Sequence, residues 1–115
     1  MMIHSTEEAI ARIEAIPELQ NKLAYDHFTE PQELPFAAYT YKFRTGGADD
    51  YKGVQWIDFT LEVYSNPRDI SLERKIISAL ADVEIDSDST YIDDERMYMT
   101  YFRFIFPYKL TNTNP

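Results

Sequence analysis

The feature that most constrains the fold is a strict alternation of apolar and polar residues over nine consecutive positions of the sequence. Ile57, Phe59, Leu61 and Val63 occupy the odd-numbered positions, and polar or amphipathic side chains occupy the even-numbered ones. Successive side chains of a β-strand point to opposite faces, so this alternation predicts a strand with one buried face. We therefore expect a strand over 54–64 that packs on the core.

Two other segments share this period of two and are rich in aromatic residues. One covers residues 36–44, and the other covers residues 97–106, where Phe102, Phe104 and Phe106 share one face. Aromatic residues are enriched in strands, which strengthens both assignments. The remaining expected strands are short and cover residues 23–25 and 90–92.

Two segments have the period and the start signals of helices. Ser5 stands three residues before Glu8, which is the spacing of a capping box, and Pro17 ends the regular helix that follows. Asp69 can cap the second helix through its side chain. The apolar stripe of the second helix comprises Leu72, Ile76, Ala79, Leu80 and Val83. The side of the second helix that is expected to face water comprises Glu73, Lys75, Ser78 and Asp82.

The order of these elements predicts the fold class. Helices inserted among runs of strands, without strict βαβ alternation, are typical of an α+β fold with a largely antiparallel sheet. Each helix has one apolar stripe, so both helices are expected to pack on one face of the sheet. A chain of 115 residues fits a single domain, here 1–110, with a flexible tail at 111–115. The other face then carries Trp56 and Tyr64, and exposed aromatic side chains often mark protein contacts.

Charge and composition exclude several classes of function. The formal net charge is −9, and no Lys or Arg occurs among the acidic residues of 82–95. We therefore expect no sequence-specific nucleic-acid binding, which depends on basic contacts to phosphates. The absence of cysteine excludes disulfides and thiolate metal sites. No apolar run approaches the roughly 18 residues of a membrane span, and no signal-peptide core is recognisable, so no membrane association is expected.

Part of the acidic segment has the carboxylate spacing of a calcium-binding EF-hand loop. Glu84, Asp86, Asp88 and Glu95 occupy positions 1, 3, 5 and 12 of a twelve-residue frame. However, Ser89 stands where the sharp turn requires glycine, and a strand rather than a helix is expected to follow. A solvated acidic connection between helix and strand is the favoured interpretation. We therefore expect that the chain binds no metal and no cofactor. The alternative is a calcium site formed by these four carboxylates.

The residues of common catalytic sites do not occur in recognisable arrangements. The chain has two histidines, His4 and His27, and neither belongs to a catalytic triad or a metal-ligand spacing. The adjacent Gly46 and Gly47 lack the lysine and the hydroxyl residue of a phosphate-binding loop. We therefore expect a protein that is not an enzyme.

Several short motifs follow one another in a definite order along the chain. They are Leu34-Pro35-Phe36, Ala48-Asp49 with Tyr51, Trp56, Glu62-Val63-Tyr64, Asp69, Glu73, Leu80, Tyr91-Ile92, Glu95-Arg96-Met97-Tyr98 and Tyr101-Phe102-Arg103-Phe104. In this order the sequence resembles the tail-completion, or tail terminator, proteins of long-tailed phages and prophages, a class of minor tail protein, particularly from phages of Gram-positive bacteria. The resemblance covers residues 20–106. It departs from the family at Val63, where a leucine is common, and in the unusual acidity of 82–95.

The resemblance implies a virion structural protein that forms a ring, typically six-fold, on the head-proximal end of the tail tube. The implied partners are other copies of the chain, the tail-tube protein and a head-closure or neck protein. The implied location is the virion tail, and the host cytoplasm before assembly. The residues expected at subunit or tube contacts are Asp49, Tyr51, Trp56, Glu62 and Tyr64. An acidic loop that faces the lumen, where acidic walls let DNA slide, is expected to contain Asp86, Asp88, Asp93 and Asp94.

Two other functions remain open from the sequence. The first is a neighbouring head–tail neck component, such as a head-closure or stopper protein. The second is an acidic protein-binding module, either an inhibitor or a DNA mimic whose carboxylates imitate phosphates. The position of the gene relative to the portal and tail-tube genes separates the first from a tail terminator. A steep salt dependence of binding to a basic partner would indicate the second.

Overall fold

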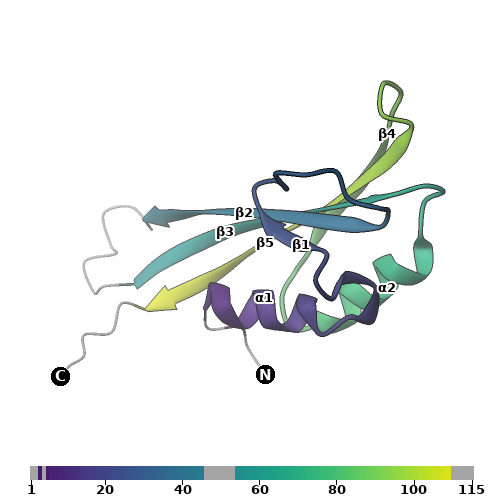
Figure 1. Cartoon of the computed structure of the whole chain (residues 1–115). Helices are drawn as coiled ribbons and strands as arrows, with labels where there is room; N and C mark the ends of the chain where they lie inside the picture. The colour runs from purple at the N-terminus through teal and green to yellow at the C-terminus, as the bar shows by residue number, and fades with distance from the viewer. Residues whose placement is uncertain (1–2, 4, 46–53, 110–115) are drawn as a thin grey trace.

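The described part of the chain, residues 3, 5–45 and 54–109 of a computed structural model, folds around one five-stranded sheet. The strand order is β1-β2-β3-β5-β4, and two α-helices lie on one side of the sheet (Figure 1). The elements in chain order are α1 (Thr6–Glu14), the 3-10 turn η1 (Pro17–Leu19), β1 (Leu23–Tyr25), β2 (Phe36–Thr45), β3 (Val54–Ser65), α2 (Ile70–Ala79), β4 (Asp86–Ile92) and β5 (Met97–Lys109). This arrangement confirms the predicted α+β class.

The sheet is largely antiparallel, as expected. β2 pairs with β3, β3 with β5, and β5 with β4, and all three pairs are antiparallel. Among the described strands, only the three-residue β1 runs parallel to its neighbour, β2. The register places Phe59 of β3 between Tyr41 of β2 and Phe104 of β5. The rings of Phe59 and Phe104 stack with their centroids 5.0 Å apart, so aromatic packing holds the central strands together.

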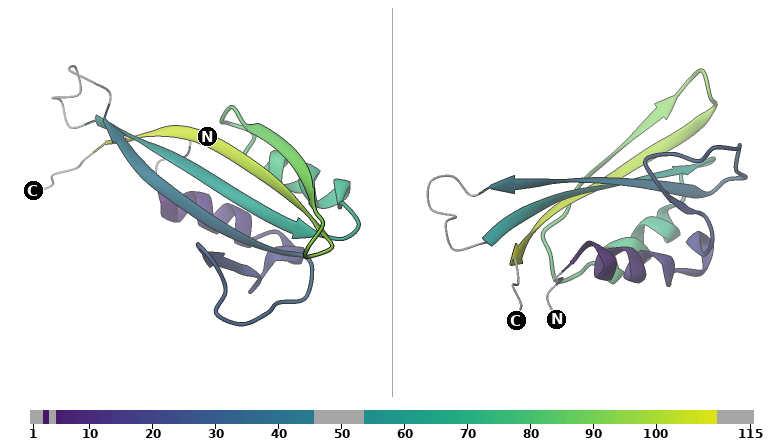
Figure 2. Two further views of the ribbon diagram at one scale, coloured as in Figure 1. Left: turned by 90° about the horizontal axis from the view of Figure 1, so that it is seen from above. Right: turned by 60° about the vertical axis from the view of Figure 1, so that its left-hand side comes forward.

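The core lies between the sheet and the helices. Ile57, Phe59, Leu61 and Val63 of β3 are all buried, which confirms the strand predicted from their alternation. Each such side chain contributes about 1.5–3 kcal/mol when it is fully buried. The buried side chains that the helix side supplies include Ile13, Leu72, Ile76 and Leu80. Both views in Figure 2 keep α1 and α2 on the same side of the sheet, in agreement with the predicted packing.

Both helices begin where the sequence predicts. The Ser5 hydroxyl oxygen accepts a hydrogen bond from the Glu8 amide at 3.1 Å, and Asp69 Oδ1 accepts one from the Leu72 amide at 3.0 Å. Each bond satisfies an amide that the first helical turn leaves without an intrahelical partner. After α1, Pro17 begins the 3-10 turn η1 instead of continuing the helix, because it has no N–H to donate.

The two helices are short and amphipathic. α1 has nine residues and α2 has ten. Neither of these described helices has the length and the apolar composition needed to cross a membrane. Each instead buries one apolar stripe against the sheet, which is the usual arrangement for a helix at the surface of a domain.

One residue expected on the water-facing side of α2 is buried. Glu73 is only 8% exposed. Its carboxylate accepts hydrogen bonds from Arg68 at 2.9 and 3.0 Å and from the Thr100 hydroxyl at 3.2 Å. Glu73 directly follows Leu72, so it lies at the border of the apolar stripe and reaches β5. The expectation for Glu73 is wrong because these donors offset the cost of burying a carboxylate.

The acidic segment forms a longer strand than its sequence indicates. β4 extends from Asp86 to Ile92, whereas the sequence predicts strand only over 90–92. Aspartate and serine have low intrinsic β propensity, but pairing with β5 along the whole segment overrides this preference. The loop expected at Asp86 and Asp88 is therefore wrong, since both residues lie in an edge strand. The tail expected at 111–115 lies outside the described residues.

Candidate functional site

The side of the sheet opposite the helices carries most of the residues that the sequence marks as contacts. Its side chains are the even-numbered residues of 36–44, 56–64 and 86–92 and the odd-numbered residues of 97–105, because the strand register aligns these positions. We call this side the open face, since neither of the described helices covers it (Figure 1 and Figure 2). Its exposed residues make it a candidate contact surface of the described fold.

The open face gathers predicted residues from two strands. The predicted site residues that share it are Trp56, Glu62 and Tyr64 on β3 and Asp86 and Asp88 on β4. Asp93 and Asp94 lie in the turn that joins β4 to β5, and both are exposed. Asp49 and Tyr51 lie outside the described residues. The two groups that the sequence treats separately, a contact strand and an acidic segment, therefore belong partly to one surface.

Tyr64 and Glu62 are joined at the surface of β3. The Tyr64 hydroxyl donates a hydrogen bond to Glu62 Oε1 at 2.8 Å. The Tyr64 ring also stacks on Phe36 of β2, with centroids 5.0 Å apart. Partial burial, together with the Glu62 and Glu95 carboxylates, raises the pKa of Tyr64 above its ordinary value. The phenol therefore stays protonated at neutral pH and can keep donating to Glu62.

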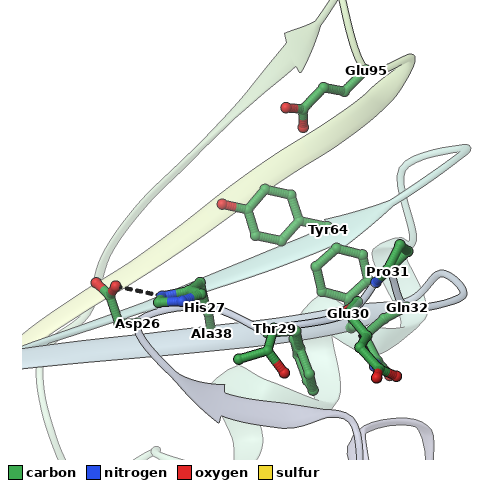
Figure 3. Close-up of a pocket in the computed structure, with 11 residues that line it drawn as sticks. Asp26, His27, Thr29, Glu30, Pro31, Gln32, Ala38, Tyr64 and Glu95 are labelled. Carbon is green, nitrogen blue, oxygen red and sulfur yellow. Dashed lines mark hydrogen bonds and ion pairs between the residues drawn. The ribbon is translucent and has the colours of Figure 1, made fainter.

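A cleft of about 470 Å³ opens beside Tyr64, next to the loop that follows β1 (Figure 3). The carboxylates of Asp26, Glu30 and Glu95 line the cleft, and no lysine or arginine of the described residues does. His27 also lines it, and its ring nitrogen Nδ1 lies 2.8 Å from Asp26 Oδ2. The cleft therefore favours cationic or hydrogen-bond-donating groups over anions.

The centre of the open face holds a buried carboxylate among basic side chains, which the sequence interpretation missed. The Asp58 side chain is 3% exposed and accepts hydrogen bonds from Arg103 Nε at 2.8 Å and Nη2 at 2.6 Å. Arg44 lies 3.6 Å from the same carboxylate, and Lys42 is the cross-strand neighbour of Asp58. The hydrogen bonds from Arg103 hold the pKa of Asp58 below its ordinary value, although burial acts in the opposite direction.

A hollow of about 350 Å³ lies next to this cluster. Thr40 and Lys42 of β2, Thr60 of β3 and Arg103 of β5 line it around Asp58. The Arg103 side chain remains 45% exposed although it binds Asp58, so part of the guanidinium stays accessible to a further acceptor. Hydroxyl, ammonium and guanidinium donors that converge in this way suit a carboxylate or another anion. The open face therefore has a basic hollow at its centre and an acidic cleft at one end.

The frame expected for the calcium alternative does not form a loop. Its middle is strand β4, Asp86–Ile92, and its end is the tight turn into β5. Within residues 3, 5–45 and 54–109, no group of three or more His, Asp or Glu side chains is arranged to hold a metal ion. The structural premise of the calcium alternative is wrong, because an EF-hand requires a loop in which the carboxylates converge.

The comparisons with known proteins leave the geometry of the open face as the main guide to function. No protein-family model matches the sequence, and a search of curated proteins finds no match. The described site offers a twisted sheet surface with separated charges and exposed apolar side chains (Figure 1). Such a surface is suited to contact with another protein.

Proposed function

We propose that this chain is a tail terminator, or tail-completion, protein of a long-tailed phage or prophage. Copies of the chain form a ring, six-fold as in the family that the sequence resembles, and the ring caps the head-proximal end of the tail tube. Capping stops tube growth and presents the surface to which a head-closure protein attaches. The chain performs this function by contact and carries out no reaction.

The observation that carries the proposal is the composition of the open face. Trp56 and Ile105 are each 39% exposed there, beside the partly exposed guanidiniums of Arg44 and Arg103. Tryptophan and arginine are among the residues most enriched at the energetic centres of protein interfaces. Exposed apolar side chains next to them stabilise a complex when a partner removes them from water. A ring subunit needs such a surface and needs no reaction centre.

The resemblance and the fold support the same surface. Trp56, Glu62 and Tyr64, which the resemblance marks as contact residues, lie on the open face in one strand. Asp86 and Asp88 lie on the same face at the β4 edge. In the proposed ring the β3 part of the face contacts the tube or a neighbouring subunit. The β4 edge faces the lumen, where carboxylates repel the phosphates of passing DNA.

The test is an assembly assay with tubes made from the tail-tube protein of the phage or prophage genome that encodes this chain. Electron microscopy scores capped ends and tube lengths after purified protein is added. We expect a ring at one end of each tube and arrest of further growth. Trp56→Ala is expected to reduce capping. The matched control Ile77→Ala, which removes a 46% exposed side chain from α2, is expected to leave capping unchanged.

Two results would overturn the proposal. Tubes that stay uncapped and keep growing with folded wild-type protein present would exclude a terminator. Binding to filled heads without any binding to tubes would indicate the neck component instead. Circular dichroism of each variant establishes that a loss of capping is not a loss of folding.

A further inference from the structure

The open face and the turn beside it carry opposite charges at separate places. Lys42, Arg44 and Arg103 surround the buried carboxylate of Asp58. The exposed carboxylate of Asp86 also acts on Arg103, so three positive charges face two negative ones at the basic hollow. The turn between β4 and β5 has the sequence Asp-Asp-Glu-Arg over 93–96, and all four residues are exposed. In Figure 1 and in the right view of Figure 2, the tip of this hairpin projects beyond the other strands, while the Arg96 carbonyl oxygen accepts a hydrogen bond from Asn66 Nδ2 at 2.9 Å.

We propose that the acidic turn of one copy docks into the basic hollow of a second copy, so that subunits join head to tail. The carboxylates of Asp93 and Asp94 bind the exposed part of Arg103 and the ammonium group of Lys42, and the Thr60 hydroxyl donates to the same oxygens. This contact rests on the proposed ring-forming function, and it names the surfaces by which neighbouring subunits recognise each other.

The spacing along β5 excludes an intramolecular version of this contact. Arg103 lies six residues beyond Met97, the first residue of β5, and six strand residues span about 20 Å. The acidic turn lies on the far side of Met97, so a subunit cannot place it in its own hollow. Asp86 is the cross-strand neighbour of Arg103 and acts on its charge. It still leaves the guanidinium partly exposed.

Charge complementarity selects a second copy as the occupant. The chain has a net charge of −9, so two copies repel each other unless a specific contact brings opposite charges together. The basic hollow supplies the positive side of such a contact, and the projecting turn supplies the negative side. Trp56 and Ile105, which are partly exposed near the hollow, add apolar burial when the second copy covers the face.

The contact joins two different surfaces, which has a consequence for assembly. A chain of docked copies leaves one hollow unoccupied at one end and one turn unoccupied at the other end. A heterologous contact of this kind continues from copy to copy and closes into a ring when the rotation per subunit allows it. Asp93 and Asp94 then lie at the subunit contact, not in the lumen where the sequence alone suggests them.

The test uses two neutralised variants of the full chain. Lys42→Gln with Arg44→Gln weakens the hollow and spares Arg103, which holds the buried carboxylate. Asp93→Asn with Asp94→Asn neutralises the turn. The matched controls, which remove the same charges from the helix side, are Arg74→Gln with Lys75→Gln and Glu7→Gln with Glu14→Gln. Sedimentation velocity at low and high salt measures the size of each sample and of the mixtures.

We expect wild-type protein to associate beyond two copies at low salt and to dissociate at high salt. Each neutralised variant alone is expected to associate at least about tenfold more weakly than the wild type. Both control variants are expected to associate as strongly as the wild type. A mixture of the two neutralised variants retains one intact contact per pair. It is therefore expected to form a heterodimer that grows no further. Three results would overturn the head-to-tail contact. They are wild-type protein that stays monomeric, wild-type protein that stops at two copies, and neutralised variants that associate as strongly as the wild type.

The tube-capping assay separates failure of this contact from failure of the proposed function. If the two neutralised variants cap tubes as well as wild type, the function stands and the contact is overturned. The same holds if the turn variant forms normal rings but slows DNA ejection, since Asp93 and Asp94 then face the lumen. If the variants change self-association as expected but wild-type protein never caps tubes, the contact stands and the proposed function fails.

Discussion

Asp58 of β3 and Arg103 of β5 form an ion pair with two hydrogen bonds, at 2.8 and 2.6 Å, between neighbouring strands of the open face. The Asp58 side chain is almost completely buried, whereas the Arg103 side chain is nearly half exposed. The carboxylate therefore depends on Arg103 for the hydrogen bonds that water would otherwise provide. The same pair holds β3 to β5 and orients the exposed part of the guanidinium.

The first prediction concerns stability. Asp58→Asn keeps the shape of the side chain but removes the charge that Arg103 and Arg44 contact. Hydrogen bonds to charged groups contribute about 1.5–3 kcal/mol. Because solvent screens the exposed part of Arg103, we expect a loss of about 1–2 kcal/mol in the free energy of unfolding, measured with urea. The exposed control Asp26→Asn should change it by less than about 0.5 kcal/mol. Equal effects of the two substitutions would contradict the prediction.

The second prediction is the pH dependence of that loss. The pKa of Asp58 is lower in the folded protein than its ordinary value of about 4, so the folded state prefers the ionised form. The stabilisation is complete above the unfolded-state pKa and disappears as the pH falls through the folded-state pKa. The difference between wild type and Asp58→Asn should therefore be constant from about pH 7 to pH 5 and shrink below about pH 4. Urea titrations across this range measure it, and a difference that grows on acidification would show the opposite sign.

The third prediction concerns the attachment of α2 to the sheet. Glu73 accepts hydrogen bonds from Arg68 and Thr100, and the Thr100 hydroxyl oxygen lies 2.9 Å from the Ser89 hydroxyl oxygen of β4. Glu73→Gln removes the charge and directs an amide N–H toward groups that themselves donate. We expect a loss of about 1–3 kcal/mol in the free energy of unfolding, against less than about 0.5 kcal/mol for exposed Glu14→Gln. A Glu73→Gln variant as stable as this control would mean that the network contributes nothing.

The elements that local patterns determine could be predicted from the sequence. Side-chain oxygens of Ser5 and Asp69 reach amides three residues further on, so both helix starts were recognisable. The alternation in β3 likewise identified its buried face. The extent of β4 could not be predicted, because Asp86 and its neighbours become strand only through pairing with β5. Glu73 was misplaced for a similar reason, since its donors come from outside α2.

The candidate site shows the same division between local and non-local information. Alternation alone placed Trp56, Glu62 and Tyr64 on one face of their strand. Asp58 and Arg103 are 45 positions apart in the sequence, and their contact depends on the adjacency of β3 and β5. No periodicity within either strand encodes that adjacency. A charged residue in the middle of a predicted strand is a usable signal, because such a residue usually has a partner on a neighbouring strand.

The fourth prediction uses the single tryptophan of the chain as a reporter of the open face. Trp56 is partly exposed in the free subunit, so acrylamide should quench its fluorescence. If a second copy covers the open face, association at low salt shifts the emission to shorter wavelength and reduces quenching, while light scattering rises. The Asp93→Asn, Asp94→Asn variant retains Trp56 and should show neither change, because its turn no longer supplies the negative charges. Scattering that rises in wild type without any change at Trp56 would mean that the copies meet through another surface.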